Sequence, residues 1–166
     1  GTHSMVDLEA LELRWFDHWL KGIDNSIVDE PPLRLFIMGI NEWRDEHEWP
    51  LARTRFTDYY LHSRGTANTM YGGGLLSTVP PDSEPVDRYR YDPADPVPTL
   101  GGPVGGALLF PELSGPKDRR PIEIRDDVLV YTSSSLTSDL EVTGPVVMTL
   151  YASTTAKDTD FTATLV

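Results

Sequence analysis

Hydrophobic residues near the amino end of the chain recur at the spacing of a helix. Between Val6 and Gly22 they fall every three or four positions on one stripe, which comprises Leu8, Leu11, Trp15, Phe16, Trp19 and Leu20. Asp7 can cap the amino end of this helix, and Gly22 suits a left-handed cap at its carboxyl end. Each large side chain left in water forfeits about 1.5–3 kcal/mol. The pattern therefore predicts an amphipathic helix that packs on a large neighbouring surface.

After Gly22 the pattern changes to short apolar runs and two-residue alternation, which are typical of strands. The predicted strands are 33–38, 54–61, 128–131, 140–143 continuing past Gly144-Pro145 into 146–152, and 161–166. The charged run from Arg44 to Glu48 is expected to be an exposed loop. The alternation runs on to Val166, so we interpret that end as a truncation and expect the last strand to find a partner in a second copy of the chain.

Proline and glycine are frequent, and with the aromatic residues they favour short strands joined by turns. The chain has 14 Pro and 13 Gly, and seven of the prolines fall between Val79 and Gly106. A regular central strand is not expected there, because proline cannot donate a ladder hydrogen bond. We predict a mainly β fold with one long irregular loop, of a kind that often has a functional role or wraps another domain.

Charge and cysteine content exclude several classes of function. The formal net charge of −12 opposes binding to nucleic acid or to an anionic membrane surface, and no run of about 20 apolar residues could span a bilayer. Without cysteine the chain has no disulfide and no cysteine-based metal site. We expect a cytoplasmic protein, and residues 1–5 are interpreted as an expression scar.

The candidate catalytic residues have simpler structural explanations. No serine lies in the Gly-x-Ser-x-Gly pattern of a hydrolase nucleophile, and 133–135 is interpreted as an exposed turn of three serines. His18 belongs to the predicted helix, His47 to the charged loop and His62 to the end of a strand. We predict no catalytic residue in this chain.

Metal and phosphate sites are weakly supported. Asp158 with Asp160, or Asp92 with Asp95, could offer oxygen ligands from a turn, but neither pair has the register of a calcium loop. The glycine-rich stretch 101–106 lacks the lysine of a phosphate-binding loop. The apolar tip that follows it, 107–111, could either fill a core or line a neighbouring pocket.

Several motifs occur in order along the chain. They are Asn41-Glu42-Trp43-Arg44 with Trp49-Pro50-Leu51, then 115–121, 125–131, 141–145 and 158–162. Together they resemble the region after the catalytic domain in the cocaine-esterase-like and X-Pro dipeptidyl-peptidase family of serine hydrolases. The resemblance covers nearly all of the chain from Val6 onward.

This resemblance implies an enzyme with an α/β-hydrolase domain and a C-terminal jelly roll similar to galactose-binding domains. Residues 6–30 would be the last helix of the hydrolase domain and a linker, and 31–166 the truncated jelly roll. The Ser, Asp and His of the triad would lie before residue 6. Leu109 and Phe110 would line the acyl pocket for a small ester or amide substrate, with no cofactor.

Two alternatives remain open from the residues. One is an autonomous sandwich that binds a carbohydrate or another small ligand through exposed aromatic rings, for which the candidates are Tyr59, Tyr60, Tyr89 and Tyr91. The other is a metal-dependent hydrolase acting through Asp and His, which the absence of clustered ligand spacing disfavours.

Overall fold

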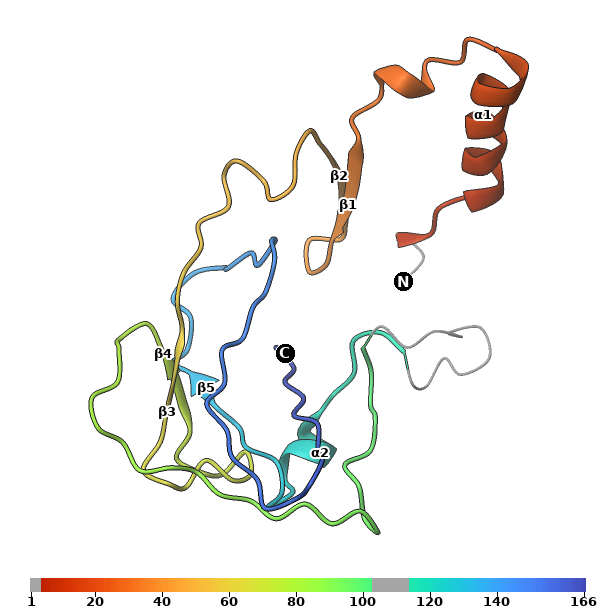
Figure 1. The fold of residues 1–166 in the computed structure, drawn as a ribbon. Helices are drawn as coiled ribbons and strands as arrows, with labels where there is room; N and C mark the ends of the chain where they lie inside the picture. Colours follow the sequence, from red (N-terminus) through yellow and green to blue (C-terminus); the bar gives the residue numbers. More distant parts are fainter. Residues whose placement is uncertain (1–3, 103–113) are drawn as a thin grey trace. The chain divides into compact units, whose positions relative to one another are not determined.

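The computed structural model describes residues 4–102 and 114–166 (Figure 1). They form two compact units: the first combines the chain up to Arg55 with Glu141–Val166, and the second is Phe56–Leu140. Two small sheets and one long helix make up most of the regular structure of the described residues. The expectation of a mainly β fold preceded by one amphipathic helix is confirmed at this level.

Helix α1, Leu8–Lys21, is capped at both ends as the sequence predicts. The Asp7 carboxylate accepts a hydrogen bond from the Ala10 amide at 3.0 Å, which satisfies one of the free N–H groups of the first turn. Gly22 closes the helix in the left-handed conformation at φ 68°, and its amide donates to the His18 carbonyl. The short 3₁₀ helix η2, Ile27–Asp29, packs against α1.

Strands β1, Leu33–Ile37, and β2, Glu42–Glu46, form an antiparallel hairpin in the first unit. The prediction for β1 is confirmed, but the prediction of a charged loop from Arg44 is wrong for its first three residues. Cross-strand partners explain the difference, because Phe36 lies opposite Trp43 with ring centroids 5.3 Å apart and Arg34 pairs with Asp45 at 3.5 Å. The charged segment is thus stable as a strand because its backbone pairs with β1 and its charged side chains find partners on β1 or elsewhere in the first unit.

The second unit is built on a three-stranded sheet. Strands β3, Tyr60–His62, and β4, Leu75–Ser77, are antiparallel, and β5, Thr132–Ser133, runs parallel to β4. The turn before β4 is tight: a Cβ added at Gly74 would lie 2.0 Å from the Val130 carbonyl oxygen. Helix α2, Arg120–Glu123, buries Ile122.

Several predicted strands are wrong in their extent. Of 54–61 only the last two residues are in β3, and the strand expected at 128–131 occurs at 132–133 instead, with Leu129 in an isolated bridge to Asn68. Residues 140–143, 146–152 and 161–166 are in no strand. A strand exists only where a neighbour completes its hydrogen bonds, and alternation alone does not supply that neighbour.

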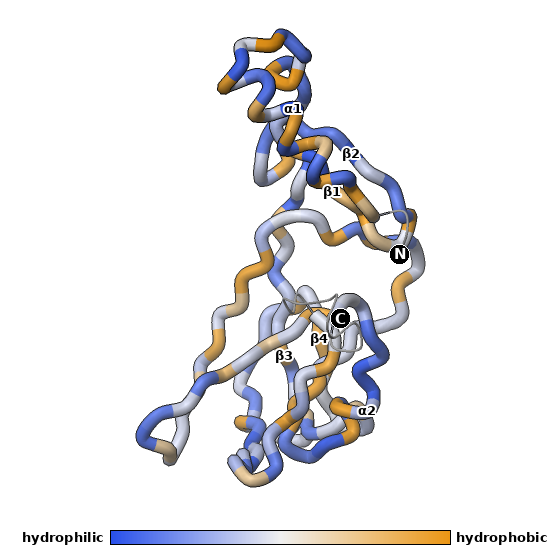
Figure 2. Tube along the Cα trace, turned by 90° about the vertical axis from the view of Figure 1, so that its right-hand side faces the viewer, coloured by the Kyte–Doolittle hydropathy of each residue, from blue (hydrophilic) through white to orange (hydrophobic). Residues whose placement is uncertain are grey.

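The buried apolar residues of the described chain are few and mostly small or aliphatic. They are Ile27, Ile37 and Leu51 in the first unit and Ala67 and Ile122 in the second. Figure 2 shows hydrophobic positions along α1 and the strands of both units, and many of these side chains are exposed. Among the described residues, no helix is long and apolar enough to cross a bilayer.

Candidate functional site

Helix α1 carries an exposed aromatic face, formed by Trp15, Phe16 and Trp19. These side chains are 51%, 51% and 58% exposed, and no residue of α1 is buried. The Trp15 and Trp19 rings lie 5.7 Å apart, and the His18 ring meets the edge of Trp19 at 4.9 Å. The rings therefore contact one another but remain accessible to a partner.

Polar contacts fix α1 to the segment that follows it. Arg14 donates to the Glu30 carboxylate at 2.6 Å, and the Asn25 side-chain amide donates to the Arg14 carbonyl at 2.7 Å. Lys21 pairs with Asp17 one turn away. These charged side chains are paired within the segment formed by α1 and the residues after it. The aromatic face beside them therefore presents only apolar side chains to a partner.

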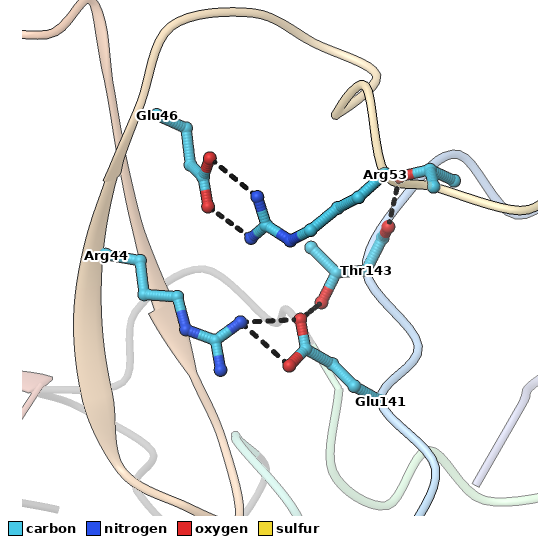
Figure 3. Close-up of polar contacts among 6 residues, drawn as sticks. Arg44, Glu46, Arg53, Glu141 and Thr143 are labelled. Carbon is cyan, nitrogen blue, oxygen red and sulfur yellow. Dashed lines mark hydrogen bonds and ion pairs between the residues drawn. The ribbon is translucent and has the colours of Figure 1, made fainter.

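The motif residue Arg44 lies in a cluster of two arginine–carboxylate pairs within the first unit (Figure 3). Arg44 on β2 donates to both oxygens of Glu141, at 2.9 and 2.8 Å, although 97 residues separate them. Arg53 forms a second two-pronged pair with Glu46. The structure thus joins two of the motifs, the one that contains Arg44 and the one that begins at Glu141.

Two threonines complete this cluster. The Thr143 hydroxyl donates to Glu141 at 2.9 Å, and the Thr54 hydroxyl donates to the Thr143 carbonyl at 3.1 Å. The hydrogen bond from Arg44 lowers the pKa of Glu141, and that from Arg53 lowers the pKa of Glu46. Both carboxylates are therefore ionised and engaged at neutral pH, which suits a fastening role better than general acid–base catalysis.

In the second unit Asp87 accepts three hydrogen bonds from separate parts of the chain. One oxygen accepts from the Ser63 hydroxyl at 2.7 Å and the Ala67 amide at 2.9 Å, and the other accepts from the Tyr131 hydroxyl at 2.7 Å. Burial raises the pKa of Asp87, but the hydrogen bonds from Ala67, Tyr131 and Ser63 outweigh it and lower the pKa overall. Burial and the contact with Asp87 both raise the pKa of Tyr131.

The candidate general bases and serines have structural partners. His18 Nδ1 lies 3.2 Å from the Ile23 carbonyl oxygen, His62 contacts Glu84 and the Val79 carbonyl, and His47 is exposed. Ser133 belongs to β5 rather than to a turn, and 133–135 is exposed as expected. The buried Ser63 hydroxyl, 8% exposed as a residue, donates to Asp87 and not to a histidine.

The acidic pairs considered as calcium ligands do not form a metal site in the described chain. Asp95 accepts hydrogen bonds from Arg125, and Asp92 accepts one from the Ala94 amide in its own turn. No group of three or more candidate ligands occurs among the described residues. Asp158 and Asp160 are exposed.

Leu109 and Phe110, predicted to line an acyl pocket, lie outside the described residues. Their role stays a prediction. The ligand-binding alternative also stays untested; Tyr59 and Tyr89 are less than half exposed, and Tyr60 on β3 is partly buried.

Sequence reasoning missed the contacts of Glu141 and Asp87, because both residues find their partners far along the chain. The contact between Arg44 and Glu141 could have been suspected, since each residue belongs to one of the ordered motifs. For Asp87 no motif indicates that its carboxylate collects donors from Ser63, Ala67 and Tyr131.

Comparison with known proteins supplies the family context. Residues 25–166 match the family described as X-Pro dipeptidyl-peptidase C-terminal non-catalytic domain. The chain is 49% identical to cocaine esterase of Rhodococcus sp. strain MB1 Bresler over 167 aligned residues, which covers all of the chain and 28% of that protein. It is 33% identical over 153 residues to "Putative serine esterase Mb1866c" of Mycobacterium bovis, covering 90% of the chain and 22% of that protein. The chain thus spans less than a third of these relatives.

Proposed function

Because the chain belongs to the X-Pro dipeptidyl-peptidase C-terminal non-catalytic domain family, we propose that it is an accessory part of a larger serine hydrolase. The parent enzyme hydrolyses small esters or amides, and its catalytic triad lies outside this chain. The role of the chain is to pack on the α/β-hydrolase domain and to shape the substrate cleft. The names of two relatives, a cocaine esterase and a putative serine esterase, support the reaction class.

The aromatic face of α1 is the observation that carries this proposal. Burying three large aromatic side chains is worth roughly 1.5–3 kcal/mol each, and this chain leaves them half exposed. Aromatic anchors with apolar surroundings are what protein interfaces use most. The charged residues nearby, Arg14 and Lys21, are paired within the same segment and do not compete for the partner.

The fold proposed for residues 31–166 is a jelly-roll sandwich. The segments 146–152 and 161–166 support it, since they carry strand-forming residues without a ladder. Val147 and Tyr151 are 85% and 96% exposed, so both would gain from a neighbouring strand. A second copy of the chain can supply that strand, which makes a homo-oligomer part of the proposal.

Leu109 and Phe110 are proposed to line the acyl pocket of the parent enzyme. Their apolar side chains follow the glycine-rich stretch 101–106, a sequence suited to an adaptable loop. No cofactor is needed for serine acyl transfer, and the acidic chain disfavours polyanionic ligands.

The first test is the activity of the purified chain towards a chromogenic ester, with a fluorophosphonate as a label for an activated serine. We expect neither turnover nor labelling. Stoichiometric labelling of a serine in this chain would overturn the proposal that its chemistry lies elsewhere.

The second test measures docking. Cocaine esterase of Rhodococcus without the region that matches this chain provides a hydrolase partner, and calorimetry measures binding of the chain to it. Trp15→Ala with Trp19→Ala should weaken binding by at least about tenfold, because two aromatic anchors are removed. Tyr71→Ala, which truncates an exposed aromatic residue in the second unit, is the matched control and should leave binding unchanged. Equal binding by all three chains would contradict a docking role for the aromatic face.

A further inference from the structure

The His62 ring at the end of β3 lies between two hydrogen-bond acceptors. Its Nδ1 is 2.7 Å from a carboxylate oxygen of Glu84, and its Nε2 is 2.8 Å from the carbonyl oxygen of Val79. The other Glu84 oxygen accepts from the Ser63 amide at 2.9 Å. A carbonyl cannot donate, and neither can an ionised carboxylate. Both ring nitrogens must therefore carry protons, so the geometry fits an imidazolium.

A neutral ring could keep only one of these contacts. With a single proton on Nδ1, the lone pair of Nε2 would face the Val79 carbonyl oxygen, and with a single proton on Nε2, the lone pair of Nδ1 would face the Glu84 carboxylate. The charge-assisted contact with Glu84 is the stronger of the two. Loss of the proton should therefore release the Val79 carbonyl first.

We propose that His62 is a charged clamp that holds residues 79–84 against the end of β3, and that its deprotonation releases the Val79 end of this segment. The two contacts bridge the segment at both of its ends, 17 and 22 residues from the histidine. No other histidine of the described chain has acceptors at both ring nitrogens. The clamp thus converts one protonation event into a change of backbone contacts.

The charged groups around His62 agree with this assignment. Glu84 faces the ring directly, Asp87 follows on the same segment and raises the pKa of Glu84, and Arg64 lines the adjacent pocket from the loop after β3. On β4 the residue opposite is the uncharged Leu75. The hydrogen bond from His62 lowers the pKa of Glu84, and the hydrogen bond to Glu84 raises the pKa of His62 although partial burial opposes it.

The sign of the pH dependence follows from these directions. His62 has a raised pKa in the folded chain, so its stabilising contribution is complete below its unfolded pKa of about 6.5 and is lost as pH rises through the folded value. Glu84 has a lowered pKa, so its contribution is lost as pH falls through that value, below about 4.3. The clamp is therefore closed in mildly acidic solution and opens on the alkaline side.

Opening of the His62 clamp would change the shape of the pocket beside it. A cavity of about 400 Å³ is lined by His62, Ser63 and Arg64 on one side and by Ser83, Glu84 and Pro85 on the other. Asp87, held by Ser63, Ala67 and Tyr131, keeps the end of the segment in place independently of His62. Release of the Val79 end would widen this cavity, with Glu84 and Asp87 as fixed points.

The experiment is a proton and nitrogen NMR titration of the histidine rings and backbone amides of the chain between pH 5 and 9. We expect both His62 ring nitrogens to be protonated at pH 6, a midpoint above the value of about 6.5 for histidine in an unstructured peptide, and amide shifts across 79–84 that follow the same midpoint. A neutral His62 at pH 6, or amides of 79–84 that ignore its titration, would overturn the clamp. These readouts need no variant, so they decide the proposal even if a substitution unfolds the chain.

Two variants add a check on the mechanism. Glu84→Gln removes the charge with little change in shape and should move the His62 midpoint to lower pH and uncouple the amides of 79–84 from it. His47→Gln alters an exposed histidine and should leave the response of 79–84 intact. An unchanged His62 midpoint in Glu84→Gln would contradict the assigned pairing.

Discussion

Asp87 illustrates how one partly buried carboxylate can organise loops that lack regular structure. Its oxygens accept from Ser63 and Ala67 in the loop after β3 and from Tyr131 beside β5, which are two different stretches of the second unit. A carboxylate can accept several hydrogen bonds at once, whereas an amide or hydroxyl replacement cannot match all of them. The hydrogen bonds of Asp87 connect irregular segments of the chain, as the backbone hydrogen bonds of a sheet connect its strands.

We expect Asp87→Asn to lower the free energy of unfolding of the second unit by about 1–3 kcal/mol. The amide side chain keeps one acceptor oxygen and presents N–H groups to donors, which leaves polar groups unsatisfied. Urea unfolding followed by fluorescence measures the change. Asp82→Asn, at an exposed aspartate of the same segment, is the control and should be within about 0.5 kcal/mol of the parent chain.

The lowered pKa of Asp87 also predicts a loss of stability in acid. Its contribution is present above the unfolded pKa of about 3.9 and is lost as pH falls through the lower folded value. Unfolding measured from pH 6 to pH 2 should therefore show a steeper decline in the parent chain than in Asp87→Asn. Parallel curves would mean that the pKa of Asp87 is the same in the folded and unfolded chain.

Among the elements, the hairpin of β1 and β2 stays in place partly through its contact with the segment that begins at Glu141. The pair of Arg44 with Glu141 is the longest-range ion pair in the described chain. Its side chains are about one-third exposed, so solvent screening limits its effect on global stability. Loss of this pair should therefore act locally, by making the backbone of residues 141–143 more mobile.

Arg44→Gln should accelerate amide hydrogen exchange at Val142 and Thr143 while leaving β3 and β4 unchanged. The Glu141 carboxylate would lose both guanidinium contacts and keep only the Thr143 hydroxyl. Arg34→Gln, which breaks the more exposed pair with Asp45 in the same hairpin, is the matched control. If both variants exchange alike, the arginine in the motif has no special fastening role.

The amino-terminal cap of α1 permits a test at the level of a single helix. Asp7→Ala should reduce helix content and cost about 1 kcal/mol, because the Ala10 amide loses its acceptor. Circular dichroism of the chain measures the helix content. Glu12→Ala lies within the same helix, and it should preserve or slightly raise that content, since alanine is the best helix former.

At the scale of the whole molecule, exposed apolar side chains favour association with a partner domain or a second copy. Large apolar side chains are exposed in each of the two units of the described chain. On α1 and in the segments 146–152 and 161–166 these side chains include Trp15, Trp19, Val147, Tyr151 and Val166. Such a surface is what partner domains or further copies cover.

We therefore expect light scattering of the purified chain to give a mass above that of the monomer. Tyr151→Lys places a charge in the exposed apolar stretch 146–152 and should shift the population towards monomer. Tyr71→Lys, at an exposed site in the second unit, should leave the mass unchanged. A monomeric mass for the parent chain at high concentration would contradict association through this stretch.

Local signals in the sequence determined several parts of this protein. The caps and spacing of α1 and the apolar run of β1 were predictable, because each depends on residues only a few positions apart. The ordered motifs likewise indicated the family, and the match over 25–166 confirms it.

Only the tertiary structure decided where strands form and which charges meet. Strand β2 depends on its pairing with β1, β5 on a parallel pairing with a strand more than 50 residues earlier, and Arg44 on a carboxylate 97 residues away. The segment 146–152 is rich in strand-forming residues and forms no strand in the described chain. A strand and an ion pair each need a partner, and the position of that partner is a property of the folded chain rather than of the local sequence.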